Sequence, residues 1–481
     1  MDLEKKLVLK KQLISAAALL PSAFAAVYFA YCLMLGTINI FAVRNIYYAF
    51  VPAFLVMYAL FVTLMIYLFS EKKFTYNCTV EKAELITFPV IAMTVWINCA
   101  MAAWVSPYAT PIAFTVLLIG VLVSPRCGLY SGLLSAVASA ICIAPPVYFY
   151  LPGEFGVSFA MSAVADFVTA FFMLFVINRR YNRFSLTWGA IAVSLGTALV
   201  GAVMSLLDGW TLRNFFGGYA LGVMGNVVAV CAFTAILPVF EYFSRIWTDF
   251  KLAEICGLDQ PVLRKMSEEA PGTFNHALNV ANLAENCAIA IGIDPYMARA
   301  CAYYHDMGKM NDPLYFSENQ TGYNPHDDLI PEVSVAKIRR HTRDGYEQLR
   351  KMRFPDEICK AALEHHGDSP IMFFYTKAKG LGGDVNIEDF RYDCPTPTTK
   401  YSAIIMICDI CESMTRAVQP ESIQALEKTV DKVIKDKLAD GQFDDTDITM
   451  EELNKIGETI VKVIPGMLHK RIDYAKAKEE R

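Results

Sequence analysis

Charged residues are distributed very unevenly along this chain of 481 residues, and that distribution limits its fold more than any other feature. Up to about residue 238, long apolar runs are interrupted only by brief charged loops, whereas charges become frequent from Glu241 onward. The whole chain is 19% charged, below the roughly 25% of a typical soluble protein. A helix of about 20 apolar residues spans the roughly 30 Å core of a bilayer. The sequence therefore predicts a polytopic bundle of transmembrane helices followed by a soluble half.

Eight apolar segments of the first half are predicted to be membrane spans. They are residues 13–36, 47–69, 85–105, 108–124, 128–151, 157–178, 186–207 and 215–240. Ser106, Pro107 and Pro111 leave little room for a loop between the third and fourth segments, so these two could instead form one helical hairpin. The count of eight is therefore tested against the charges of the connecting loops.

Basic residues gather at alternate junctions between the predicted spans. The basic junctions contain Lys5, Lys6, Lys10 and Lys11, then Lys72, Lys73 and Lys82, then Arg126, and then Arg179, Arg180 and Arg183. The other junctions carry little beyond Arg44 and Arg213. Because cytoplasmic loops are enriched in Lys and Arg, this pattern predicts an even number of spans with both termini in the cytoplasm.

Two observations bear on what the membrane half and the whole chain could bind. Asp166 lies inside the sixth segment, where a carboxylate is costly and often functional, although it could also be a structural residue near the outer interface. No pair of broken spans with clustered acidic residues is visible, which disfavours a transporter. The net charge of -5 and the lack of a basic stripe exclude a nucleic-acid polymer as an expected partner.

Potential metal ligands recur in a fixed order in the soluble half. They are His276, then His305 with Asp306, then His341, then His365 with His366, and finally Asp409. Imidazole and carboxylate ligands together suit divalent iron, manganese or zinc. The surrounding segments show helical patterns, and Asp409 is a single acid within the apolar run 404–410. An unpaired buried carboxylate is expensive, so a metal ion is a natural partner for Asp409.

This ordered pattern resembles the HD phosphohydrolase superfamily and, more narrowly, the seven-transmembrane HD-domain family of bacterial cyclic-di-AMP phosphodiesterases, the PgpH type. The resemblance rests on the sequence segments APGTFNH (270–276), YYHDMGK (303–309), PLYFSENQ (313–320), NPHDDLIPE (324–332), EHHGD (364–368), FFYTKAK (373–379) and DGQFDDTDIT (440–449). The stretch LPVFE (237–241) is similar to the family's exit from the membrane. The resemblance covers the spans and essentially everything after residue 237.

The resemblance implies an all-α chain with a transmembrane domain at 1–240, a juxtamembrane helical linker at 241–270 and an all-helical HD phosphodiesterase domain at 271–481. It implies an enzyme in the bacterial inner membrane, surrounded by the lipid bilayer, that hydrolyses cyclic-di-AMP to linear pApA through hydroxide activated by two metal ions. The linker could also support a homodimer. Thr449 and Glu452 fit a capping box that opens the last helix.

The resemblance also assigns residues. One metal ion would be held by His276, His305, Asp306 and Asp409, and the other by His341, His365 and His366 with Asp306 bridging. Iron or manganese is expected. Lys309 shares a helix face with Asp306 and is expected to contact phosphate, with a structural ion pair as the alternative. Arg391 and Tyr392 are further expected substrate contacts, and His326 is expected to play a supporting role.

Several departures from the family keep other functions open. Residues 37–46 stand where the family has a large extracellular domain, so its mode of sensing is not inherited. The family's FRYPGP stretch is FRYDCP at 390–395, and its Ala-Asp-Ser is Cys408-Asp409-Ile410. The alternatives are an HD phosphohydrolase that acts on another nucleotide, a catalytically quiet nucleotide-binding receptor, and a transporter with a regulatory domain.

Overall fold

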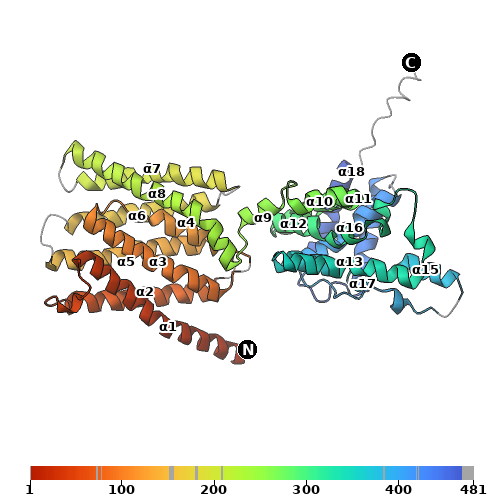
Figure 1. The fold of residues 1–481 in the computed structure, drawn as a ribbon, viewed down its shortest axis with the longest axis horizontal. Helices are drawn as coiled ribbons and strands as arrows, with labels where there is room; N and C mark the ends of the chain where they lie inside the picture. The colour runs from red at the N-terminus through yellow and green to blue at the C-terminus, as the bar shows by residue number, and fades with distance from the viewer. Residues whose placement is uncertain are drawn as a thin grey trace, which may run out of the picture. The chain divides into compact units, whose positions relative to one another are not determined.

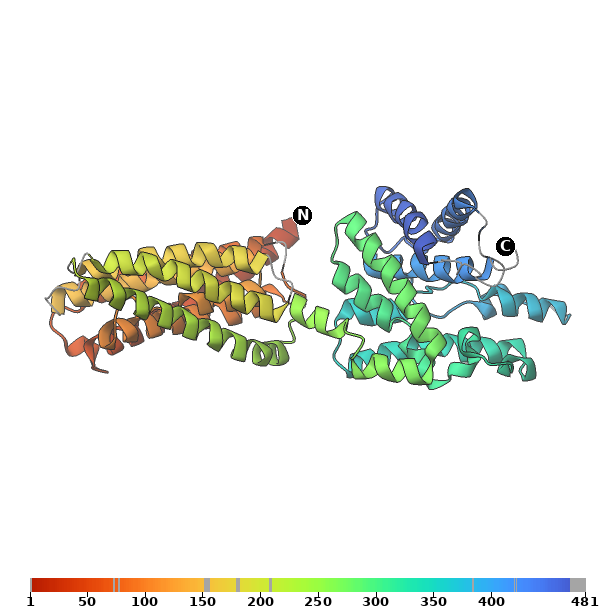
Figure 2. The same ribbon diagram turned by 90° about the horizontal axis from the view of Figure 1, so that it is seen from above.

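The computed structural model describes residues 2–71, 74–76, 78–150, 156–178, 182–206, 210–382, 385–418, 420 and 422–467. The basic residues Lys72, Lys73, Arg179 and Arg180 lie outside this set. The chain divides into two compact units, Met1–Phe250 and Lys251–Arg481, and each is a bundle of helices (Figures 1 and 2). No β-strand occurs in the described ranges, which confirms the predicted all-α fold.

The first unit contains a helix at each of the eight predicted segments. These are α1 (Asp2–Leu35), α2 (Tyr47–Ser70), α3 (Val80–Trp104), α4 (Ile112–Leu122), α5 (Pro125–Tyr150), α6 (Gly156–Asn178), α7 (Arg183–Ser205) and α8 (Leu212–Ser244), with a short 3-10 helix, η1 (Ile40–Ala42), after α1. Within the described residues, six of them are long and apolar enough to cross a membrane, and α4 and residues 162–178 of α6 are shorter apolar segments.

The outer surface of this unit is apolar. Large side chains such as Phe171, Phe175 and Trp188 are about half exposed. A soluble protein rarely exposes so much apolar surface, whereas lipid would cover it without cost. The helix lengths and this surface together are those of a multi-pass membrane protein.

Helix α4 differs from the prediction. The expected span 108–124 is wrong in length, because the helix begins only at Ile112 and has 11 residues. Such a helix rises about 16 Å, roughly half of the 30 Å core. Every residue of α4 is buried, and the non-helical residues Tyr108, Ala109 and Thr110 before it are buried too. Irregular backbone at membrane depth is tolerated where protein surrounds it.

The start of α4 is held by polar side chains from two other helices. Thr110 Oγ1 donates to Asp166 Oδ1 on α6 at 2.5 Å, and the Ala113 amide donates to Asn226 Oδ1 on α8 at 3.3 Å. The backbone at Gly225 also lies so close to Ala109 and Thr110 that a Cβ would collide with them. The contact with Thr110 gives the buried carboxylate of Asp166 a structural partner.

The second unit is built from shorter helices. The division between the units falls within α9 (Asp249–Ile255), most of which belongs to the second unit. The other helices are α10 (Pro261–Glu269), α11 (Pro271–Ile291), α12 (Pro295–Tyr304), α13 (Pro331–Lys351), α14 (Asp356–Glu364), α15 (Met372–Gly380), α16 (Lys400–Val418), α17 (Ile423–Ala439) and α18 (Met450–Met467). The 3-10 helices η3 (Met307–Asn311), η4 (Pro313–Tyr315), η5 (Ser317–Asn319) and η6 (Pro325–Asp328) connect α12 to α13, and η7 (Ile387–Phe390) precedes α16. Helix α11 packs against α12, α16 and α18, and α13 packs against α14. The expected linker region therefore contains the end of α8 and two short helices.

Local signals set several helix boundaries of this unit. Gly292, with φ of 74°, ends α11, and Asp294 caps α12 by accepting from the amides of Tyr296 and Met297 at 2.8 and 3.2 Å. This tight turn brings α11 and α12 side by side. The capping box predicted for α18 is confirmed, because the Thr449 amide donates to Glu452 at 2.8 Å and the Glu452 amide donates to Thr449 Oγ1 at 3.2 Å.

Candidate metal centre and adjoining cavity

The predicted ligands converge from five helices or their ends. His276 lies on α11, His305 and Asp306 directly follow α12, His341 lies on α13, His365 and His366 follow α14, and Asp409 lies on α16. Helix α14 ends at Glu364, one residue before the histidine pair. His365 keeps helical backbone angles, so the two adjacent rings still converge, with centroids 4.0 Å apart.

Asp306 lies at the middle of the cluster and is 1% exposed. Its Oδ1 lies 3.4 Å from His341 Nε2 and 3.5 Å from His365 Nε2. Its Oδ2 lies 3.2 Å from His305 Nε2 and 3.9 Å from His276 Nε2. Oδ2 also pairs with the Lys309 ammonium at 2.6 Å, whereas Oδ1 has no hydrogen-bond partner among the described residues. Each oxygen of one buried carboxylate thus faces a different pair of imidazoles.

Asp409 joins the same two sides of the cluster. Its Oδ1 lies 2.9 Å from His276 Nε2, and its Oδ2 lies 3.7 Å from His366 Nδ1. The single acid of the apolar run 404–410 therefore has imidazole partners, and the metal ion expected beside it stays a prediction.

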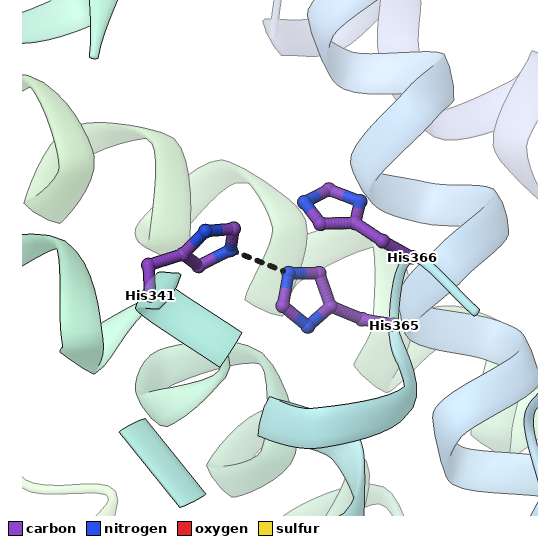
Figure 3. A group of neighbouring side chains, drawn as sticks. All are labelled: His341, His365 and His366. Atoms are coloured by element: carbon purple, nitrogen blue, oxygen red, sulfur yellow. Dashed lines mark hydrogen bonds between the residues drawn. The ribbon is translucent and has the colours of Figure 1, made fainter. Parts of the chain in front are cut away.

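Three histidines point a lone pair into the centre. Each directs Nδ1 to a backbone carbonyl of the preceding turn: His305 to Ala302 at 2.7 Å, His341 to Ile338 at 2.6 Å and His365 to Ala361 at 3.0 Å. Donation from Nδ1 fixes the tautomer and leaves Nε2 as an acceptor or metal ligand. Figure 3 shows the rings of His341, His365 and His366 gathered around one region, with the His341 and His365 Nε2 atoms 3.3 Å apart.

The donor set fits divalent cations. Ligand atoms of His341, His365 and His366 lie within 4.8 Å of one another, and so do those of His276, His305 and Asp306. Asp306 Oδ1 and His305 Nε2, which have no hydrogen-bond partner among the described residues, are atoms that a cation would satisfy. Imidazole and carboxylate together suit iron, manganese or zinc, and these residues could hold one or two such ions.

The electrostatics of the centre are polarised. Burial disfavours a charge on His276, but the carboxylates of Asp409 and Glu412 outweigh it and raise the pKa of His276 to about 10. Burial lowers the pKa of His341 to about 3. Burial also disfavours ionised Asp306, yet His305 and Lys309 hold the pKa of this carboxyl well below its usual range. The centre therefore favours a positive charge on His276, between the carboxylates, and a neutral imidazole at His341.

Lys309 forms an ion pair within the centre. Its Nζ lies 2.6 Å from Asp306 Oδ2 and 2.9 Å from Glu318 Oε1, and it lies 5.0 Å from the centre of the Phe316 ring. Burial opposes the ammonium charge, but Asp306 and Glu318 raise the pKa of Lys309 above its usual range. Lys309 is thus a fixed cation, carried by the 3-10 helix η3 and not by an α-helix.

A cavity of about 550 Å³ adjoins the cluster. Lys309, His341, His366, Tyr392 and Asp409 form its polar side. Its other walls include the aromatic residues Tyr315, Phe316, Phe373 and Phe374. A concave apolar site with a few converging polar groups is typical of a small-molecule pocket.

The remaining predicted residues lie in different surroundings. Tyr392 lines the cavity and stacks on His366, with ring centroids 4.3 Å apart. Arg391 is not among the residues that line the cavity, and its guanidinium contacts Glu388 at 3.1 Å and the Asp368 carbonyl at 3.0 Å. His326 lines the cavity, and its Nε2 lies 2.9 Å from the Tyr315 carbonyl.

Known proteins resemble this chain both in its HD domain and over most of its length. The HD domain family model matches residues 273–414, the segment that contains every proposed ligand. The cyclic-di-AMP phosphodiesterase PgpH of Bacillus subtilis (strain 168) is 31% identical over 437 residues, which cover 89% of this chain and 60% of that protein. Residues 273–414 thus match an HD domain, and the chain is similar to PgpH over most of its own length.

Proteins named PgpH from a second organism match a smaller share of the chain. PgpH of Listeria monocytogenes serotype 1/2a (strain 10403S) is 39% identical over 281 residues, which cover 58% of this chain and 37% of that protein. The crystal structure of the L. monocytogenes PgpH HD domain in complex with cyclic-di-AMP is 42% identical and covers 44% of this chain and 99% of that one, with a TM-score of 0.42. The chain thus spans less than two thirds of the length of the curated PgpH proteins that it matches.

Two glutamates, Glu412 and Glu318, touch the centre without standing out in the motif order. Glu412 Oε2 lies 2.6 Å from His276 Nδ1, and Glu318 pairs with Lys309. Glu412 follows Asp409 by three residues on α16, so helical periodicity could have singled it out. Glu318 contacts Lys309 through the folding of the 3-10 segment, which has no periodic signal in the sequence.

Proposed function

We propose that this chain is a membrane-anchored, metal-dependent phosphodiesterase that opens cyclic-di-AMP to linear pApA. The observation that carries the proposal is Asp306, whose two oxygens face two sets of imidazoles beside a cavity of about 550 Å³. The names of the PgpH relatives support the choice of substrate.

Two divalent ions are the expected cofactors. His276, His305, Asp306 and Asp409 would hold one, and His341, His365 and His366 would hold the other with Asp306 shared. Two such ions, iron or manganese, would supply Lewis acidity that makes hydroxide available at neutral pH and stabilises charge on the phosphodiester.

The chain's own residues would bind and orient the substrate. Lys309, held between Asp306 and Glu318, offers a fixed positive charge to a phosphate oxygen at the cavity wall. Phe316, Phe373 and Phe374 offer apolar faces for a base. Tyr392 packs on His366 and limits the movement of that ring.

The remaining proposals concern the setting of the enzyme. The chain would lie in the bacterial inner membrane with both termini in the cytoplasm, as the basic junctions predict. Residues 1–240 would form the membrane domain, 241–270 the linker and 271–481 the catalytic domain. A homodimer through the linker is part of the same proposal.

The test uses the full chain purified in detergent and loaded with manganese or ferrous iron. Cyclic-di-AMP and cyclic-di-GMP are supplied side by side, and the products are separated by chromatography. We expect cyclic-di-AMP to be opened to pApA, and Asp306→Ala to abolish the reaction. Asp312→Ala is the matched control, because Asp312 is a half-exposed acid that pairs with Lys337.

Each outcome of that test separates the candidates. Hydrolysis of another nucleotide by the wild type, but not by Asp306→Ala, would replace the substrate and keep the site. Tight nucleotide binding without any product, in protein that contains two metal ions, would favour a catalytically quiet receptor. Equal activity of the wild type and Asp306→Ala would refute the proposed site.

A further inference from the structure

The imidazoles of the centre differ in what lies behind them. His305, His341 and His365 each direct Nδ1 to a neutral backbone carbonyl. His276 instead has Nδ1 only 2.6 Å from the carboxylate oxygen Oε2 of Glu412. A carboxylate behind a ligand imidazole orients the ring and makes the nitrogen on its other side a stronger donor. The centre is therefore asymmetric in the groups that support its ligands.

Glu412 is itself firmly held. It is 5% exposed, its Oε1 accepts from Asn279 Nδ2 at 3.0 Å, and its Oε2 lies 3.7 Å from Arg416. Asn279 follows His276 by three residues on α11, and Glu412 follows Asp409 by three residues on α16. His276 and Asn279 on one face of α11 therefore contact Asp409 and Glu412 on one face of α16, and the His276 ring lies between the two carboxylates.

Negative charge is correspondingly uneven across the centre. His276 lies 2.9 Å from Asp409 and 2.6 Å from Glu412, with Asp306 at 3.9 Å. On the other side, the nearest carboxylate oxygens to His341 and His365 belong to Asp306, at 3.4 and 3.5 Å, and His366 lies 3.7 Å from Asp409. No carboxylate equivalent to Glu412 lies within 4 Å of these three imidazoles among the described residues. In a buried site, an additional carboxylate strengthens the attraction for a divalent cation.

We infer that Glu412 is a positioning residue that makes the His276 side the tighter of two cation sites, so that the two ions bind in sequence. The side formed by His341, His365 and His366 is then the weaker and more readily exchanged site. This inference rests on the proposed metal-dependent function. It adds the order in which the two metal ions bind, which the identity of the ligands alone does not predict.

The test measures metal binding instead of catalysis. Metal-free full-length protein in detergent is titrated with Mn²⁺, and free Mn²⁺ is counted by electron paramagnetic resonance. We expect two binding steps in the wild type, separated by about tenfold or more. Glu412→Gln keeps the shape of the side chain but removes its charge, and should weaken the tight step by about 10- to 100-fold while changing the weak step by less than about threefold.

Two further variants guard against a general loss of structure. Glu364→Gln is the matched control, since Glu364 is equally buried but accepts hydrogen bonds from the Thr398 amide and hydroxyl. It should leave the tight step unchanged. Asn279→Ala keeps the charge of Glu412 and removes its anchor, so it should weaken the same step by a smaller factor.

The outcomes distinguish this inference from the proposed function. Two equal sites in the wild type, or equal weakening of both steps by Glu412→Gln, would overturn the inference and leave the metal centre intact. No Mn²⁺ binding by the wild type would overturn both. Two unequal sites, with only the tighter one sensitive to Glu412→Gln, would support the inference even if cyclic-di-AMP were not the substrate.

Discussion

The Nε2 atoms of His341 and His365 lie 3.3 Å apart, and both lie within 3.5 Å of the same oxygen of Asp306. Two neutral imidazoles at this distance present lone pairs to each other, and this is unfavourable unless a proton or a cation lies between them. Burial of this pair makes protonation costly, as the lowered pKa of His341 shows. The arrangement therefore suits a metal ion better than a proton.

A first prediction concerns the pH dependence of stability in the presence of EDTA. The pKa of His341 is about 3 in the folded protein, below the ordinary 6.5 of the unfolded chain. Protonation of His341 therefore opposes folding. The stability that comes from keeping His341 neutral is fully present above pH 6.5 and is lost as the pH falls toward 3. Between pH 6.5 and 5 this should destabilise the protein by on the order of 2 kcal/mol.

Calorimetric unfolding midpoints across that pH range check this prediction. In His341→Gln, the unfolding midpoint should fall less steeply as the pH is lowered. Part of the fall should remain, because burial also lowers the pKa of His366. His276 has the opposite sign, because its pKa of about 10 gives stability below pH 6.5 that is lost as the pH rises through 10. An unfolding midpoint that falls as steeply with decreasing pH in His341→Gln as in the wild type would contradict the prediction.

A second prediction concerns Lys309. Lys309→Met removes the positive charge beside Asp306 and Glu318 and should lower kcat by about 10²-fold, as expected for loss of an electrostatic contact in the transition state. Bound metal should be retained, because Lys309 is a cation and not a ligand. Lys337→Met, at a 37% exposed lysine paired with Asp312, is the control and should keep full activity. Loss of metal from Lys309→Met would instead favour a purely structural ion pair.

A third prediction concerns the close approach of η3 to α13. A Cβ on Gly308 would lie 1.9 Å from the His341 carbonyl oxygen and 2.7 Å from the Gly345 amide nitrogen. Gly308→Ala must therefore push η3 from α13, at a cost of about 1–3 kcal/mol for overpacking, and should displace Asp306 from His341. Thermal unfolding and metal content would both report the change.

The control for that substitution is Gly380→Ala on α15, where nothing lies within 4 Å of the added Cβ. It should match the wild type in both measurements. A Gly308→Ala protein with normal metal content and stability would show that the backbone contact can relax without disturbing the centre.

A fourth prediction separates the two expected substrate contacts. Tyr392 lines the cavity and stacks on His366, so Tyr392→Leu should raise KM for cyclic-di-AMP by about 3- to 10-fold through loss of an aromatic contact. The guanidinium of Arg391 contacts Glu388 and the Asp368 carbonyl, so Arg391→Gln should lower thermal stability and change KM less. A larger rise in KM for Arg391→Gln would restore Arg391 as the main substrate contact.

Much of the fold was predictable because its signals are local. Apolar runs located eight helices of the first unit, and the Thr449–Glu452 capping box identified the start of α18. The order of histidine and aspartate residues suggested a single centre, and the structure brings these residues together. Composition, periodicity and helix caps are properties of short segments, so they can be read without knowledge of tertiary contacts.

The features that escaped prediction depend on contacts between distant segments. The start of α4 is hydrogen-bonded to Asp166 and Asn226, which lie on two other helices far along the chain. The pairing of Glu412 with His276 joins α16 to α11 across 136 positions of sequence. Helical periodicity puts Glu412 on the same face as Asp409, but its pairing with His276 becomes visible only once the helices are assembled.

The proposed ligands begin with His276 on α11 and end with Asp409 on α16, and this order has a consequence for biosynthesis. A nascent chain that stops before α16 carries every proposed ligand except Asp409, the carboxylate that joins both sides of the centre. Docking of α16 onto α11 therefore closes the centre after all the other ligands have been made. A chain truncated or delayed at this point would lack a finished centre, so its hydrolytic capacity would appear only once the ribosome had passed the last of these helices.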